Sequence, residues 1–441
     1  MSRSGYVLRT VPAALMFVLL AAHFLRWSQV GLVAVALAAP LLLVSRRKWT
    51  PVVVQLLLAA GALVWVQTAV AIVQQRLSAG VPWGWAAAIM AAVTLATLGA
   101  AALLRSERVR ARHRVAAQSA GASAAAFCLV FGIGAFPHLK MRDPVPLIAE
   151  RFLPGSGWGE LLLLAIYAAW LVEKLLDAGT TDRIRRNVWA GFSLVFFLQL
   201  ALGVAGVAKL LMTGALHLPV PAMIAAGPFF RGETSFFMPI LLGVTLLVAG
   251  PAWCSWFCYL GSWDFIASRS ADEPGVLPRH PDAARIAILI LLCGGAAALR
   301  MAGVPAPVAA SLGILFGIGG VAVMLLASRR TGIMVHCTAY CPIGLIATVV
   351  GKINPLRVRI GGGCTQCQSC IPTCRYGALT ETTLRQYKPG PTCTLCGDCL
   401  SACPGAQIGY RFPGLTAAGA KRMFFAIAAS VHALFIGFGR I

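Results

Sequence analysis

The stretch from residue 364 to residue 404 reads CTQCQSCIPTCRYGALTETTLRQYKPGPTCTLCGDCLSACP and holds eight of the chain's 14 cysteines. These eight form two runs with one spacing, C-x2-C-x2-C-x3-C, and the second run begins 29 residues after the first. Two-residue gaps let a tight loop direct three thiolates at one [4Fe–4S] cluster, while the fourth cysteine reaches the other cluster. The stretch therefore predicts a small α+β bacterial ferredoxin module with two clusters.

Each cluster takes three thiolates from one run and one from the other. The predicted ligands are Cys364, Cys367, Cys370 and Cys403 for the first cluster, and Cys393, Cys396, Cys399 and Cys374 for the second. Zinc sites rarely use this doubled spacing, and disulfides fit poorly in a reducing cytoplasm. Arg375 stands where the pattern expects proline, but ligation does not depend on that position.

The composition around this stretch is that of a membrane protein. Hydrophobic residues make up 59% of the 441 residues and charged residues only 12%, whereas soluble domains carry about 25% charged residues. The net charge of +23 is explained by positive cytoplasmic loops and anionic lipid head groups. Nucleic-acid binding is excluded as a function class, because no aromatic–basic binding module accompanies the charge.

Apolar runs of spanning length predict an all-α polytopic bundle of about eleven transmembrane helices. The expected spans are 10–25, 28–45, 51–74, 84–104, 115–135, 159–177, 188–212, 235–253, 284–302, 305–328 and 422–439. Placing the N-terminus in the cytoplasm puts most of the 37 Lys and Arg residues inside, as the positive-inside rule requires. This topology makes the ferredoxin module cytoplasmic and places the C-terminus outside, in a bacterial inner membrane.

Four further cysteines form a matched pair of motifs. Residues 254–261 read CSWFCYLG and residues 337–344 read CTAYCPIG, so both fit C-[ST]-x-[FY]-C-x-[LI]-G. Each follows a span that runs from outside to inside, and positions i and i+4 share a helix face. We therefore expect Cys254, Cys258, Cys337 and Cys341 to converge where two helices meet the cytoplasm.

The chemistry of these four thiols stays open at the level of sequence. They are suited to a third [4Fe–4S] cluster, to copper or zinc, or to cycling between dithiol and disulfide. Cys128 and Cys293 lie alone in apolar spans, and buried single cysteines usually behave as small hydrophobic residues.

The cysteine motifs give the chain a family resemblance. It resembles the NapH/NosR/CcoG-type membrane polyferredoxins, 4Fe–4S binding membrane proteins that join several spans, paired C-x3-C-P motifs and a two-cluster ferredoxin segment. The likeness covers about residues 115–441 and includes RFLPGSGWGE (151–160), LHLPVPAMI (216–224) and GPAWCSWFCYLGSWD (250–264). Tyr259 replaces the proline expected after the first C-x3-C, and no flavin-binding domain of the NosR kind is present.

The resemblance implies membrane electron transfer, either for a partner reductase or as a copper reductase in the assembly of another enzyme. The organisation expected is an N-terminal transmembrane module (1–110), a transmembrane core with both C-x3-C motifs (111–350), the ferredoxin module (351–413) and a last transmembrane helix (414–441). The leading hypothesis is an electron relay between a cytoplasmic or quinone donor and a partner redox protein, with activity like that of a quinol dehydrogenase. The alternative is a copper or thiol reductase that serves as an assembly factor.

The sequence also bears on partners and on cofactors other than clusters. Residues 352–422 carry nine Lys and Arg against Glu381 and Asp398, which suits membrane lipid or an acidic soluble ferredoxin or flavodoxin. Haem is disfavoured, since His23, His217 and His432 are singly placed and no C-x-x-C-H exists. Glu173 and Asp177 lie four apart near the inner end of their span, where ionisable groups suggest proton or quinone chemistry.

Overall fold

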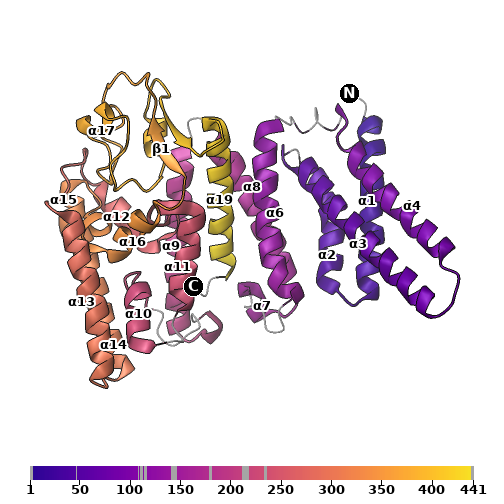
Figure 1. Cartoon of the computed structure of the whole chain (residues 1–441), viewed down its shortest axis with the longest axis horizontal. Helices are drawn as coiled ribbons and strands as arrows, with labels where there is room; N and C mark the ends of the chain where they lie inside the picture. The colour runs from indigo at the N-terminus through magenta and orange to yellow at the C-terminus, as the bar shows by residue number, and fades with distance from the viewer. Residues whose placement is uncertain are drawn as a thin grey trace. The chain divides into compact units, whose positions relative to one another are not determined.

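The computed structural model describes residues 3–45, 47–107, 109, 113, 117–140, 147–177, 181–210, 218–232 and 236–438. The chain is mostly helical (Figure 1) and divides into two compact units, Met1–Glu173 and Lys174–Ile441. His217 lies outside the described residues.

The first unit is a set of mostly apolar helices. Its elements are α1 (Arg3–Arg26), α2 (Val30–Ala38), η1 (Ala39–Leu43), α3 (Thr50–Ser78), α4 (Gly84–Leu103), α6 (Ala117–Lys140), α7 (Ile148–Phe152) and most of α8 (Gly157–Leu176). Small residues let the helices approach closely, because a side chain at Gly61 of α3 would meet Leu20 of α1.

The second unit carries all twelve clustered cysteines. Its helices are α9 (Thr181–Val204), η2 (Ala208–Leu210), α10 (Met223–Arg231), α11 (Phe237–Ala249), η4 (Gly250–Ala252), η5 (Trp253–Phe257), α12 (Tyr259–Ser268), α13 (Pro281–Met301), α14 (Ala306–Val323), η6 (Met324–Ser328), α15 (Arg329–Thr331), η7 (His336–Tyr340), α16 (Pro342–Val350), α17 (Glu381–Arg385), α18 (Asp398–Ser401) and α19 (Ala417–Phe438). Long apolar helices form one end of this unit, and the cysteine-rich loops lie at the other end, around β1 and α17 (Figure 1).

Among the described residues, nine helices are long and apolar enough to cross a membrane, which is compatible with a membrane protein. They are Tyr6–Arg26, Thr50–Ser78, Gly84–Leu103, Ala120–Pro137, Thr181–Val204, Phe237–Phe257, Pro281–Met301, Ala306–Thr331 and Ala417–Phe438. The expected span 28–45 appears as the shorter helix Val30–Leu43, and α8 carries Glu160, Glu173 and Lys174 within its 20 residues. The count of eleven therefore stays a prediction.

A two-stranded antiparallel sheet closes the cysteine-rich region. Strand β1 (Arg357–Ile360) pairs with β2 (Ile408–Arg411), with Val358 opposite Tyr410 and Ile360 opposite Ile408. These four side chains are buried, whereas Arg411 is exposed. The pairing joins the two ends of the region, so that both cysteine runs lie between the strands in sequence, and α19 packs against β2.

Candidate iron–sulfur and thiol sites

The two ferredoxin runs repeat each other in backbone conformation as well as in spacing. Gln366 and Leu395 occupy equivalent positions and have φ of 57° and 58°. Gln368 and Gly397 are the next equivalent pair, with φ of 61° and 87°. Left-handed residues alternating with ordinary ones turn successive N–H groups toward one point, the arrangement of anion-binding nests found at many Fe–S sites. Each loop is therefore shaped around an anionic centre.

The last cysteine of each run is held in the same way. The backbone N–H of Ala378 donates to Cys374 Sγ at 3.3 Å, and that of Gln407 donates to Cys403 Sγ at 3.3 Å. Hydrogen bonds of this kind stabilise a thiolate and help to set a cluster's reduction potential.

The structure brings the second predicted ligand set together, and these residues are called the inner quartet. Cys374, Cys393, Cys396 and Cys399 all line one small cavity. Burial raises the pKa of Cys374, Cys393 and Cys396 to about 12. Four cysteines are the donor set that a [4Fe–4S] cluster takes, although among the described residues no three such side chains form a group that could hold a single metal ion.

The first predicted set also lies together and is called the outer quartet. Burial raises the pKa of Cys370, and negative charge on Cys403, Cys364 and Cys367 raises it further. Cys367 is exposed, and hydrogen bonds with Ser369 lower its pKa. The outer quartet thus differs from the inner quartet in its contact with solvent.

Each C-x3-C motif forms a π-helical turn. The turns η5 and η7 end where Cys258 N–H donates to Trp253 O at 2.9 Å and Cys341 N–H donates to His336 O at 2.7 Å. The second cysteine of each pair leaves the helix in an extended conformation, with φ/ψ of −76°/115° and −79°/118°. The helix that carries each pair is thus a π-helical turn, with the first cysteine inside the turn and the second at its C-terminal cap.

The shared glycine of the motif has a steric cause. A Cβ at Gly261 would lie 2.6 Å from Cys254 O, and a Cβ at Gly344 would clash with Cys337 O. No side chain other than hydrogen fits against these carbonyls. The repeated pattern C-[ST]-x-[FY]-C-x-[LI]-G therefore encodes one local fold twice.

The four C-x3-C thiols are buried near one another. Burial raises the pKa of Cys337 well above its ordinary value, and negative charge on Asp264 and on the other three cysteines raises it further. All fourteen cysteines are free. Among the described residues, no three His, Cys, Asp or Glu side chains form a group that could hold a metal ion.

The inner quartet is joined directly to the first C-x3-C turn. Ser255 Oγ donates to Thr394 O at 2.8 Å, and the Tyr376 hydroxyl donates to Cys254 O at 3.0 Å. Ser255 and Cys254 belong to the turn, whereas Thr394 and Tyr376 belong to the loops of the inner quartet. These contacts place the two cysteine sites side by side.

A buried ion pair, which the sequence reasoning missed, fastens this junction. Arg185 of α9 donates to both carboxylate oxygens of Asp398, at 3.0 and 2.7 Å, and to Ser255 O at 3.0 Å. Its side chain is 1% exposed. Asp398 lies between Cys396 and Cys399, so Arg185 contacts both sites. In the sequence Arg185 belongs to the basic run 183–186 near a helix start, which indicates a cytoplasmic end of a span and not a partner for one arginine.

Four other residues singled out in the sequence have defined contacts in the structure. Glu173 forms an ion pair with Arg47 at 3.4 Å. His432 is buried beside Phe192, with ring centroids 5.2 Å apart, and His23 lies beside Trp65 at 5.1 Å. Arg375 donates to four backbone carbonyls, those of Ser268, Ala271, Asp272 and Gly332. It therefore fastens the inner loop to its neighbours.

Comparison with known proteins gives one match. Residues 230–264 match a 4Fe–4S binding domain family. This segment contains Cys254 and Cys258 and none of the eight cysteines of the ferredoxin runs. No curated protein and no solved structure matches the chain. The match supports an iron–sulfur protein, and it falls on the motif whose chemistry the sequence left open.

Proposed function

We propose that this chain is a membrane-bound iron–sulfur protein that relays electrons along three cysteine sites: the outer quartet, the inner quartet and the four C-x3-C cysteines. The observation that carries the proposal is the direct junction between the inner quartet and the first C-x3-C turn, through Tyr376, Ser255 and Arg185. A [4Fe–4S] cluster in each site would supply one-electron transfer.

The chain's own residues give the relay its order. The outer quartet reaches solvent at Cys367, so a soluble carrier meets this site first. The inner quartet has no exposed cysteine and contacts the membrane-side turn. Cys254 lies at the end of the apolar span Phe237–Phe257 and Cys258 follows it, and Cys337 and Cys341 come shortly after the span Ala306–Thr331. These cysteines therefore lie closest to any partner within the bilayer.

The third site is proposed to hold a cluster because of its surroundings. The 4Fe–4S binding domain match covers Cys254 and Cys258. Arg285 of α13 is 2% exposed, and its positive charge lowers the pKa of Cys341 against the effect of burial. A buried cation offsets the negative charge of a thiolate-ligated centre.

The second candidate is a copper or thiol reductase that acts in the assembly of another enzyme. It is favoured by one observation, four buried cysteines that lie near one another in the two C-x3-C turns. Two C-x3-C pairs of this kind are suited to a soft metal ion or to disulfide formation. In that case the ferredoxin sites would serve to reduce the thiol pairs.

Electron paramagnetic resonance of the dithionite-reduced protein tests the relay. Three neighbouring clusters give mutually broadened signals, and replacing Cys337 with serine removes the coupling from the inner quartet. The matched control is Cys293→Ser, which changes a lone thiol and should leave the spectrum unchanged. Signals that do not respond to Cys337→Ser would contradict a third cluster and favour the reductase.

A further inference from the structure

Two buried side chains of opposite charge, Asp264 and Arg285, lie beside the four C-x3-C cysteines. Asp264 is 0% exposed and Arg285 is 2% exposed. Arg285 forms its ion pair with Asp282, whose side chain is 56% exposed, and among the described residues no ion pair is found for Asp264. Because a buried charge is costly unless a nearby group interacts with it, both side chains point to a role at the cysteine site.

Asp264 connects the helix of the first motif to the turn of the second. It lies in α12, which begins directly after Cys258, and its Oδ2 accepts a hydrogen bond from the backbone N–H of Cys337 at 2.9 Å. The other carboxylate oxygen, Oδ1, has no hydrogen-bond partner among the described residues. A negative charge is therefore fixed where the two C-x3-C motifs meet.

Arg285 brings a positive charge to the same site from α13. A Cβ placed on Gly344 would lie 3.4 Å from Arg285 Nη1. Gly344 is the last residue of the second motif, so the guanidinium lies against the segment that follows Cys341. The Nε atom of Arg285 has no hydrogen-bond partner among the residues that the structure describes.

The two charges act on the thiols in opposite directions. Burial raises the pKa of Cys341, the positive charge of Arg285 lowers it, and the negative charge of Asp264 raises it. Burial also raises the pKa of Cys337, and Asp264 adds to that rise. A charge that disfavours a thiolate also disfavours an added electron, so the same signs apply to the reduction of a thiolate-ligated centre.

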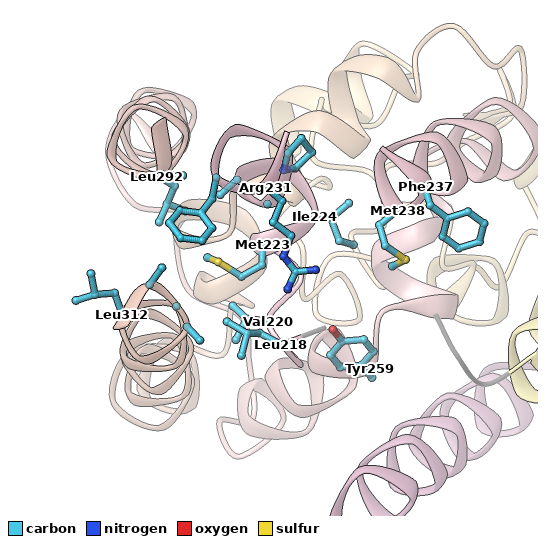
Figure 2. Close-up of a pocket in the computed structure, with 18 of the residues that line it drawn as sticks. Leu218, Val220, Met223, Ile224, Arg231, Phe237, Met238, Tyr259, Leu292 and Leu312 are labelled. Carbon is cyan, nitrogen blue, oxygen red and sulfur yellow. The ribbon is translucent and has the colours of Figure 1, made fainter. Parts of the chain in front are cut away.

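The surroundings of the first turn screen these charges weakly. Helices α9, α10, α11, α13, α14 and α19 all contribute residues to a large apolar cavity with a volume of about 600 Å³ (Figure 2). Trp253 and Phe257 of η5 line it, as does Tyr259, which Figure 2 labels. Neither Asp264 nor Arg285 is among the lining residues. Charges beside such apolar space act more strongly on their neighbours than they would in water.

We propose that Asp264 and Arg285 set the reduction potential of the centre held by the C-x3-C cysteines, with Asp264 lowering it and Arg285 raising it. Four cysteines are the donor set that a [4Fe–4S] cluster takes. Asp264 and Arg285 act through these cysteines, so they are positioning residues and not ligands. The inference rests on the proposed function, because it needs a cluster at the third site.

A redox titration of the full-length protein with dithionite and mediators, followed by electron paramagnetic resonance, tests the effect of Asp264. Asp264→Asn removes the charge but keeps the size of the side chain and an oxygen for the Cys337 N–H. The equilibrium constant for one-electron reduction of the C-x3-C centre should rise by about tenfold, which corresponds to about 59 mV. Asp272→Asn, the same change at an exposed residue after α12, is the matched control and should change the constant by less than about twofold.

The same titration should show the opposite effect for Arg285. Arg285→Gln should lower the equilibrium constant by about tenfold, whereas Arg279→Gln, an exposed change just before α13, should leave it within about twofold. Arg285→Lys keeps the positive charge and should restore the potential of the unchanged protein. A loss of packing alone would affect the lysine and glutamine variants alike, so equal effects of these two would contradict the proposal.

Three further outcomes would overturn the proposal. They are an unchanged constant in Asp264→Asn, shifts of the same sign in Asp264→Asn and Arg285→Gln, and the loss of about four irons per chain in Asp264→Asn. The signals of the outer and inner quartets are internal references and should not move. Iron and sulfide of the unchanged protein test the relay separately: about 8 of each would contradict the third cluster, whereas about 12 with unshifted potentials would contradict this inference alone.

Discussion

The outer and inner quartets use the same local sequence pattern but differ in their surroundings. Both loops adopt left-handed residues at equivalent positions, and both hold their last cysteine through a backbone N–H. The outer quartet exposes Cys367, whereas burial raises the pKa of Cys393 and Cys396 in the inner quartet to about 12. The comparison teaches that one spacing builds the same loop conformation twice, while the protein around each loop decides how far its cysteines reach solvent.

The largest expected effect comes from breaking the ion pair that belongs to the inner quartet alone. Asp398→Ala leaves Arg185 buried without its carboxylate partner. We expect the free energy of unfolding of the second unit to fall by about 3–5 kcal/mol. Denaturant unfolding in detergent, with limited proteolysis of the cysteine-rich region, measures this.

Asp182→Ala is the matched control on the same helix as Arg185. Its ion pair with Arg186 is partly exposed, with side chains 29% and 28% exposed, and such pairs contribute about 0–1 kcal/mol. Equal losses for the two variants would show that the inner quartet is not fastened through Asp398.

The two quartets should lose iron to a chelator at different rates. A water-soluble iron chelator should remove about four irons from the outer quartet at least about tenfold faster than the remaining iron, because Cys367 is exposed. Cys367→Ser should abolish this fast phase only. A single phase for all the iron would contradict the difference in burial.

The basic surface beside the outer quartet should affect the rate of encounter with an acidic carrier. Gln368 Nε2 donates to Glu381 Oε1 at 2.9 Å, so α17 and its exposed Arg385 lie beside the outer loop. Arg385→Glu together with Lys388→Glu should slow reduction by a flavodoxin about fivefold at low salt, and less at high salt. Arg330→Glu, an exposed substitution on α15, is the control. Stopped-flow mixing measures the rate for the unchanged protein, the double variant and the control. An equal effect of the control would contradict docking at this face.

The smallest effect should come from single hydroxyls at the inner quartet. Tyr376→Phe and Tyr410→Phe each remove a buried hydrogen bond, to Cys254 O and to Leu395 O respectively, both of 3.0 Å. Each should cost about 0.5–1.5 kcal/mol. Only Tyr376→Phe should change the reduction potential of the C-x3-C site, as measured by redox titration. The same reduction potential in both variants would contradict a role for the Tyr376 hydroxyl in coupling the inner quartet to the C-x3-C site.

Much of the fold follows from hydropathy. The expected span 51–74 lies within α3 (Thr50–Ser78), and the expected span 284–302 nearly coincides with α13 (Pro281–Met301). The short helices α10, α12 and α16 were not predicted, because segments of nine or ten residues fall below spanning length. Two ferredoxin strands of four residues each are likewise too short to show a reliable pattern.

The grouping of the cysteines was predictable from their spacing, since the repeat carries its geometry locally. The π-helical turns were not, because an i to i+4 spacing reads first as an α-helix. Arg185 was not predictable either, since 213 residues separate it from Asp398. The cavity beside Tyr259 depends on six helices that meet only in the folded chain. Local chemistry could therefore be predicted, and the contacts that connect one site to the next could not.

Iron and acid-labile sulfide per chain, measured on anaerobically purified protein, test the three-site relay most directly. The account predicts about 12 of each, falling to about 8 in Cys337→Ser and staying at about 12 in Cys293→Ser. About 8 of each in the unchanged protein, with no loss in Cys337→Ser, would contradict a third cluster and leave the C-x3-C thiols to copper or disulfide chemistry.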